Sequence, residues 1–163
     1  MRNRLTAFGL MMILLVGVTS CLGSDDDSGT EIYQDTAISA FTLGSMTRTL
    51  HTTSSTGEDS TYTATVTGSR YKMTIDQQKG LVYNTDSLPL GTDVSRVLCT
   101  ITTRNSGTVV LNLRTHDGLK DSLVYYSSTD SLDLTKPLEV RIYNQAGSAF
   151  RTYTVKVGVR QQG

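Results

Sequence analysis

The chain has 163 residues, and its 15 lysines and arginines are balanced by 15 aspartates and glutamates. This length suits one domain with its own core, and the absence of a basic excess argues against nucleic acid as a partner. Two cysteines, Cys21 and Cys99, are too few for more than one disulfide.

The first 20 residues have the layout of an export signal. Arg2 and Arg4 precede an apolar run over residues 5–18, and the small polar residues Thr19 and Ser20 follow it. A basic start, an apolar centre and a small-residue end are typical of a cleaved signal peptide. The apolar run of about 14 residues is too short to span a bilayer as a helix, which takes about 20 residues.

The end of this leader resembles the lipobox of bacterial lipoproteins. The four residues are Val18, Thr19, Ser20 and Cys21. The resemblance implies cleavage before Cys21 and attachment of acyl chains such as palmitate to the protein's new N-terminal cysteine. Two acyl chains give a stable anchor, so the membrane becomes a partner through lipid alone. A plain secretory signal followed by an incidental cysteine is the alternative.

Residues 21–35 read as a lipidated cysteine and an acidic, Gly/Ser-containing tether. Such a segment cannot bury enough apolar surface to order itself. Its residues Ser24, Asp25, Asp26 and Asp27 resemble the export signal of Bacteroidetes surface lipoproteins. The resemblance implies a place in the outer membrane facing the cell exterior, with a periplasm-facing anchor as the alternative.

From residue 36 to residue 160 the pattern is that of β-strands. Tyr62, Ala64 and Val66 alternate with threonines, as expected for strands with one buried and one wet face. The predicted strands cover residues 38–43, 61–66, 71–75, 81–83, 97–103, 109–113, 123–126, 138–143 and 150–159. With turn residues between them and no helical periodicity, they predict an all-β, immunoglobulin-like β-sandwich, followed by a short tail over residues 161–163.

Two segments carry a family resemblance. Residues 132–143 and 152–157 resemble the closing hairpin of bacterial Ig-like modules, which form the first folded unit of uncharacterised Bacteroidetes lipoproteins. Residues 75–76, 80–84 and 86–95 resemble one subfamily whose longer members continue into a kelch-like β-propeller. The resemblance implies no catalytic residues. Because this chain ends at Gly163, it is either a single-domain relative or a fragment of a longer protein.

Residues able to do chemistry are scarce. Cys99 lies in an apolar β-type run, where a buried inert thiol is the expected state. His51 and His116 lack neighbours at the spacing of zinc ligands, and no Gly-x-Ser-x-Gly sequence is present. We therefore predict no catalytic residue, no metal site and no cofactor, and expect the protein not to be an enzyme.

Tyr125 and Tyr126 are candidate glycan contacts. Adjacent residues of a strand point to opposite faces, so one of the two rings is expected to be exposed. A tyrosine ring can stack on a sugar when tryptophan is absent. The alternative is that both rings pack the core or its rim.

Five aspartates are followed by serine or threonine and then a small or apolar residue or a threonine. These triplets resemble the O-glycosylation sites of exported Bacteroidetes proteins, and bulky sugars need surface positions. The candidate acceptors are Thr36, Ser60, Ser87, Ser122 and Ser131. The alternative is that Asp-Ser simply marks turns.

These features favour a non-catalytic surface module. It either spaces a partner from the membrane or binds an extracellular protein or glycan. The alternative is a structural subunit of a fimbria-like assembly, in which donated strands link β-sandwiches.

Overall fold

The computed structural model describes residues 35–114 and 120–162. These residues form β-strands joined by turns and two short 3-10 helices. The strands are β1 (Ile38–Leu43), β2 (Ser45–Thr53), β3 (Asp59–Thr67), β4 (Met73–Asp76), β5 (Leu81–Asn84), β6 (Val97–Thr103), β7 (Thr108–Asn112), β8 (Leu123–Tyr125), β9 (Ser131–Leu132), β10 (Leu138–Tyr143) and β11 (Phe150–Lys156). The 3-10 helices are η1 (Gly68–Arg70) and η2 (Arg104–Ser106).

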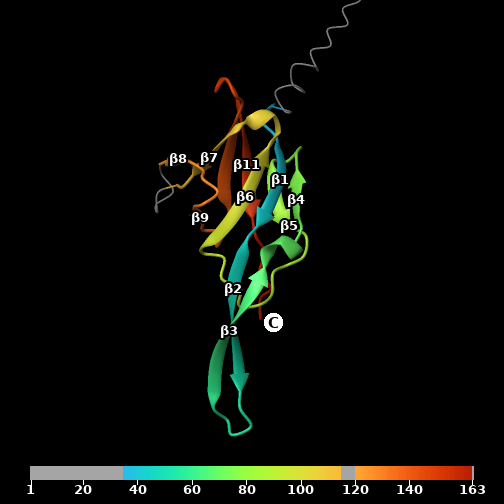
Figure 1. Cartoon of the computed structure of the whole chain (residues 1–163), viewed down its shortest axis with the longest axis vertical. Coiled ribbons are helices and arrows are strands. Elements are labelled where there is room, and N and C mark those ends of the chain that lie inside the picture. Colours follow the sequence, from blue (N-terminus) through green and yellow to red (C-terminus); the bar gives the residue numbers. More distant parts are fainter. Residues whose placement is uncertain (1–34, 115–119, 163) are drawn as a thin grey trace, which may run out of the picture.

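Two sheets form the body of the molecule (Figure 1). One has the strand order β1-β6-β9 and the other the order β4-β5-β11-β10-β7-β8. All pairs within them are antiparallel except β5 with β11, which is parallel. The apolar side chains of both sheets form one core cluster, so the predicted all-β sandwich is confirmed.

Alternation along each strand separates the core from the surface. In β10, Leu138, Val140 and Ile142 are buried, while Glu139 and Arg141 between them face outward. In β1 the alternation changes phase, because the register with β6 shifts between Ile38 and Ala40. A bulge of this kind inserts one residue and re-aims the side chains that follow it. It lets Ile38, Phe41 and Leu43 all reach the core.

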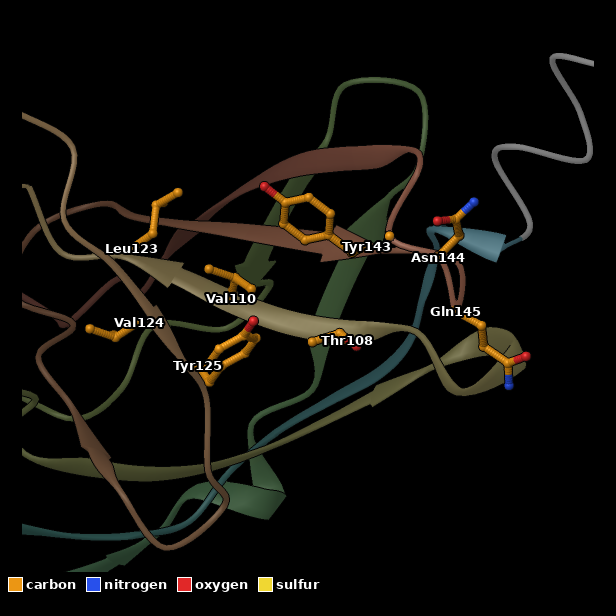
Figure 2. A pocket seen from close by; sticks show the side chains of 9 residues that line it. Thr108, Val110, Leu123, Val124, Tyr125, Tyr143, Asn144 and Gln145 are labelled. Carbon is orange, nitrogen blue, oxygen red and sulfur yellow. The ribbon is translucent and has the colours of Figure 1, made fainter.

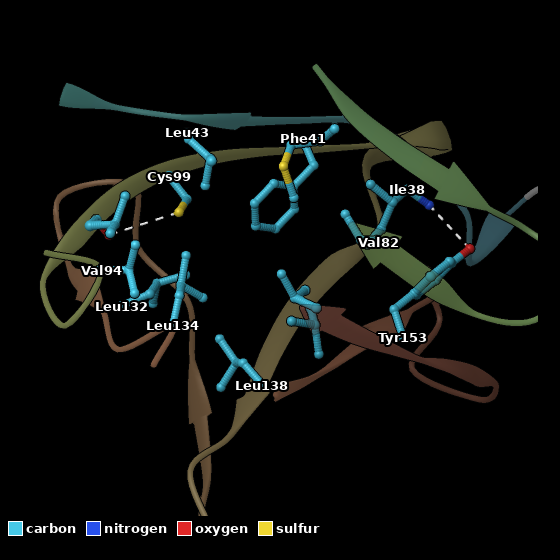
Figure 3. Close-up of a cluster of buried hydrophobic side chains, with 14 of the residues drawn as sticks. Ile38, Phe41, Leu43, Val82, Val94, Cys99, Leu132, Leu134, Leu138 and Tyr153 are labelled. Carbon is cyan, nitrogen blue, oxygen red and sulfur yellow. Dashed lines mark hydrogen bonds between the residues drawn. The ribbon is translucent and has the colours of Figure 1, made fainter. Parts of the chain in front are cut away.

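The core lies between the two sheets (Figure 3). Its fully buried side chains include Ile38, Val82, Val140 and Tyr153. Cys99 is buried in the same core cluster, as expected from its sequence context, and burial raises the pKa of its thiol to about 12. A thiol held protonated in this way is a poor nucleophile.

Tyr153 ties the two sheets together at one end of the core. Its hydroxyl donates to Oε1 of Gln77 at 2.6 Å and accepts from the backbone N–H of Ile38 at 3.3 Å. Nε2 of Gln77 donates in turn to the Ile38 carbonyl at 2.8 Å. The backbone N–H of Ile38, the first residue of β1, is thereby bonded to a side chain from β11, and its carbonyl is bonded to a side chain from the turn after β4.

The strands β2 and β3 form a separate two-stranded hairpin that extends away from the body (Figure 1). Only its base is held, where the N–H of Thr49 donates to the Gly91 carbonyl at 3.0 Å and the N–H of Asp93 donates to the Thr47 carbonyl at 2.8 Å. The sequence pattern did not predict β2. Arg48 sits between Met46 and Leu50, and most of the strand is exposed, so its apolar alternation is weak.

Other strand boundaries differ slightly from the predicted ones. The last strand was predicted to reach Val159 but ends at Lys156. Beyond it, the Asn84 side chain takes over the pairing, with Oδ1 accepting from the Gly158 N–H at 2.6 Å and Nδ2 donating to the Gly158 carbonyl at 2.8 Å. Strand β9 was not predicted because two residues are too short to show a period.

Loss of the Tyr153 hydroxyl is expected to destabilise the fold. The substitution Tyr153→Phe leaves the Ile38 N–H and the Gln77 amide with a missing partner in a buried place, which costs about 1–3 kcal/mol of unfolding free energy. Equilibrium denaturation in urea measures this loss. The control Tyr125→Phe alters an exposed ring and should change the free energy by less than about 0.5 kcal/mol.

Candidate functional site

A groove lies on the outer face of the six-stranded sheet (Figure 2). It has a volume of about 440 Å³ and runs between β8 and the turn that joins β10 to β11. The side chains come from three neighbouring strands and this turn. They are Thr108, Val110, Leu123, Val124, Tyr125, Tyr143, Asn144 and Gln145, and Gly147 completes the lining.

Register places two tyrosines on either side of β7, which forms the floor of the groove. Tyr125 of β8 pairs with Val110, and Tyr143 of β10 pairs with Thr108. Tyr125 is 80% exposed, the highest value among the large hydrophobic residues in the described part of the chain. Most of this ring is therefore open to solvent and available for contact with a ligand.

Tyr143 is held more firmly than Tyr125. Its ring centroid lies 5.0 Å from that of Phe150, with the two planes tilted by 35°. The Arg141 guanidinium lies 5.3 Å from the Phe150 centroid and adds a cation–π contact. One wall of the groove is therefore packed, while the opposite wall presents the free ring of Tyr125.

The polar groups around the groove are amides and hydroxyls. Oδ1 of Asn144 accepts from the N–H groups of Ser148 at 2.9 Å and Ala149 at 3.2 Å, so this amide shapes the turn. Gln145 and Thr108 are exposed at the groove. Of the described residues that line it, none carries a charge at neutral pH, which suits a neutral ligand rich in hydroxyl groups.

A charged cluster borders the groove on the same face. Arg141 contacts Asp121 at 3.0 Å and Glu139 at 2.9 Å, and Arg114 contacts Glu139 at 2.8 Å. Nδ2 of Asn112 donates to Asp121 at 2.9 Å and to Glu139 at 3.2 Å. Both carboxylates are neutralised and hydrogen-bonded. The cluster therefore fixes the segment before β8 against β7 and β10.

The cluster shifts the pKa of its carboxyl groups downward. Hydrogen bonds from Asn112 and then Arg141 lower the pKa of Asp121. For Glu139 burial is the largest single influence and raises the pKa, but hydrogen bonds from Asn112, Arg141 and Arg114 together outweigh it and lower the pKa. A carboxyl held ionised in this way is unsuited to act as a general acid.

Tyr126 lies on the opposite side of the sheet from Tyr125. Its hydroxyl donates to the Cys99 carbonyl and its backbone N–H donates to the Val109 carbonyl at 3.1 Å. The half-buried ring packs against the core, and burial raises the pKa of the phenol. The two adjacent tyrosines thus face opposite ways. Tyr126 is removed from the candidate glycan contacts because its ring and hydroxyl are already engaged.

The candidate O-glycosylation residues divide by exposure. Ser60, Ser87 and Ser131 are exposed, and Ser122 is half-buried. Thr36 is 0% exposed, so the prediction for this residue is wrong for the folded domain: no transferase can reach its hydroxyl.

The predicted lipidation site and export signal lie outside the described residues. They are Cys21, Ser24, Asp25, Asp26 and Asp27.

The described residues provide neither a cluster of metal ligands nor a membrane-spanning helix. His51 is exposed on the β2–β3 hairpin. Residues 35–114 and 120–162 contain no group of three or more His, Cys, Asp or Glu side chains placed to hold a metal ion. Over the same ranges no helix is long and apolar enough to cross a membrane.

Two groove residues, Tyr143 and Gln145, were not singled out from the sequence. Tyr143 ends a strand and Gln145 lies in the following turn, at the sequence Tyr-Asn-Gln-Ala-Gly. An aromatic residue at the end of a strand is ordinary, and only the pairing of β10 with β7 places it across β7 from Tyr125.

The charged cluster should make stability depend on pH under acidic conditions. A carboxyl whose pKa is lowered on folding stabilises the fold above its unfolded pKa, about 4.3 for Glu, and this contribution disappears as the pH falls through the folded value. The unfolding free energy of the Glu139→Gln variant should therefore fall less between pH 5 and about pH 2 than that of the wild type.

Urea denaturation at several pH values measures this slope. Glu58→Gln, on the exposed turn of the β2–β3 hairpin, is the matched control and should retain the wild-type slope. A Glu139→Gln variant with an unchanged slope would contradict the role given to the cluster.

Comparison with known proteins gives one match. A family model described as the domain of unknown function DUF6242, N-terminal domain, covers residues 41–157. No curated protein and no solved structure matches the chain. The matched residues run from within β1 to Val157, directly after β11, and so include nearly the whole sandwich. The chain therefore belongs to the DUF6242 family, of which the described sandwich is an N-terminal domain.

Proposed function

We propose that this protein is a non-catalytic, lipid-anchored surface protein whose immunoglobulin-like sandwich binds a neutral extracellular glycan. The groove that contains Tyr125 and Tyr143 is the binding site. The single observation that carries this proposal is the exposed Tyr125 ring beside an uncharged groove of about 440 Å³.

The groove supplies both kinds of contact that a sugar needs. The C–H face of a pyranose stacks on an aromatic ring, and its hydroxyl groups bond to amides and hydroxyls. Tyr125 offers the ring, and Gln145 and Thr108 offer the polar groups. The groove is open at the surface, so it suits part of a polymer as well as a short oligosaccharide.

The non-catalytic part of the proposal rests on the two carboxylates of the charged cluster that borders the groove. Glycoside hydrolysis needs one carboxyl group that is protonated near neutral pH and a second that acts as base or nucleophile. The pKa of both Asp121 and Glu139 is lowered, and both are bound to arginine.

The lipid anchor follows from the sequence features of residues 1–27. Cys21 would carry the acyl chains, and Ser24 with the three following aspartates would direct export to the outer face of the outer membrane. As an N-terminal domain next to the anchor, the sandwich would also hold any further domain away from the membrane. Ser60, Ser87, Ser122 and Ser131 remain candidates for O-glycosylation.

Truncation of Tyr125 should weaken glycan binding. In isothermal titration calorimetry with neutral hexasaccharides of glucose, mannose, galactose or xylose, at least one should bind the wild type. The substitution Tyr125→Ala should then weaken binding at least tenfold, about 1.4 kcal/mol.

Tyr62→Ala is the matched control, because Tyr62 is another exposed tyrosine but lies on the β2–β3 hairpin. It should bind like the wild type. Equal loss in both variants, or no binding of any neutral hexasaccharide, would contradict the assignment of the groove.

Removal of the Cys21 thiol should release the protein from the membrane. In a bacterium that processes lipoproteins, the wild type and Cys99→Ala should fractionate with the outer membrane, while Cys21→Ser should not. The intact mass of the wild type should show the acyl chains, and any hexose additions would report use of the glycosylation candidates. Equal fractionation of all three forms would exclude a lipid anchor on Cys21.

A further inference from the structure

The free edge of the β2–β3 hairpin is the clearest unused feature of the molecule. The two strands pair over nine consecutive positions without a bulge, from Ser45 with Thr67 to Thr53 with Asp59. An isolated two-stranded hairpin is marginally stable in water. Beyond the base, this one has no described partner on either face, and almost all its side chains are exposed.

The hydrogen bonds at the base show which backbone groups face outward. Thr47 and Thr49 bond to the Gly91–Asp93 loop and therefore direct their N–H and C=O groups away from β3. In an antiparallel pair, opposite residues share the same orientation, so Thr65 and Thr63 direct theirs away from β2. Because the orientation repeats every two residues along a strand, the N–H and C=O groups of Thr61 also point away from β2.

These outward groups on β3 have no backbone partner among the described residues. The edge of β2 is different, because the Gly91–Asp93 loop occupies it at Thr47 and Thr49 and leaves only its last few residues open. Strand β3 has little of the usual protection of an edge. Asp59 is its only charged residue, and residues 60–67 contain no proline and no lysine.

We propose that β3 pairs antiparallel with β3 of a second copy of this chain, centred on Tyr62, to form a four-stranded sheet across a two-fold axis. Residues 59–65 of the two copies pair in this register, and Tyr62, which is 54% exposed, lies on the two-fold axis. This register brings Thr61 opposite Thr63 of the second copy, so that the outward N–H and C=O groups of one strand can hydrogen-bond to those of the other. The two bodies lie at opposite ends of the shared sheet.

The side chains are self-complementary in this register. Leu50 lies opposite Tyr62 within one hairpin, so the sheet carries a continuous apolar row of Leu50, Tyr62 and their two copies. Aromatic and aliphatic cross-strand neighbours of this kind stabilise a sheet. Asp59 lies opposite Thr65 of the second copy, so no pair of like charges is created by the strand pairing. An isologous contact of this type closes on itself as a dimer.

A matched pair of proline variants tests the edge. Thr63→Pro removes one outward N–H from β3, and His51→Pro removes one from the short open edge of β2, while neither removes a bond within the hairpin. In sedimentation equilibrium of the full chain in density-matched detergent, the wild type and His51→Pro should be dimers. Thr63→Pro should be a monomer with an unchanged circular dichroism spectrum.

A second experiment does not depend on proline. Under mild oxidation, Tyr62→Cys should give a disulfide-linked dimer, because opposite side chains in a non-hydrogen-bonded pair lie close together. Tyr83→Cys, at another exposed tyrosine on β5, should not. A monomeric wild type, a dimer that survives Thr63→Pro, or equal crosslinking of both cysteine variants would overturn the proposal. Crosslinking of Tyr62→Cys to a different protein would overturn it in favour of a foreign strand.

Discussion

The register between β7, β10 and β11 is the constraint on which the rest of the structure depends. It sets Val140 and Ile142 into the core and leaves Arg141 and Tyr143 on the outer face. A slip by one residue would exchange these two sets. The core, the charged cluster and the wall of the groove are therefore consequences of one hydrogen-bonded ladder.

The outer face of this sheet divides into two parts with different roles. Around Arg141, every charge is paired, and the cluster fixes the segment that leads into β8. Around Tyr125, no charge is present among the described lining residues, and the ring is left free. The charged cluster positions Tyr125, because it holds the segment that leads into β8 against β10. The proposed glycan site is thus a small uncharged area held in place by a rigid, neutralised cluster beside it.

Much of this fold could be predicted from the sequence because the central strands alternate clearly. The predicted bounds of β1, β6 and β10 agree with the structure, and each of these strands buries apolar side chains, in strict alternation along β10. Strand β2 could not be predicted in this way, because Arg48 interrupts its apolar positions and the strand buries little. Its stability comes from pairing with β3 and from the bonds to the Gly91–Asp93 loop, and neither is visible in a local pattern.

The site was accessible to sequence reasoning only in part. Adjacency alone showed that Tyr125 and Tyr126 must face opposite ways, but only the hydrogen bond of Tyr126 to Cys99 shows which ring is engaged. The burial of Thr36 was hidden for a similar reason, since the triplet that contains it looks like any other exposed turn. Long-range pairing places Tyr143 and Tyr125 on either side of β7, and no spacing in the sequence encodes that arrangement.

The most direct measurement is an amide chemical-shift titration of the protein with a neutral hexasaccharide that it binds. The account predicts that the shifted amides cluster on β8, around Thr108 and in the turn that contains Gln145. It also predicts that the β2–β3 hairpin and the three-stranded sheet remain unchanged. Shifts confined to either of those regions, or saturating binding with no change at β8, would contradict it.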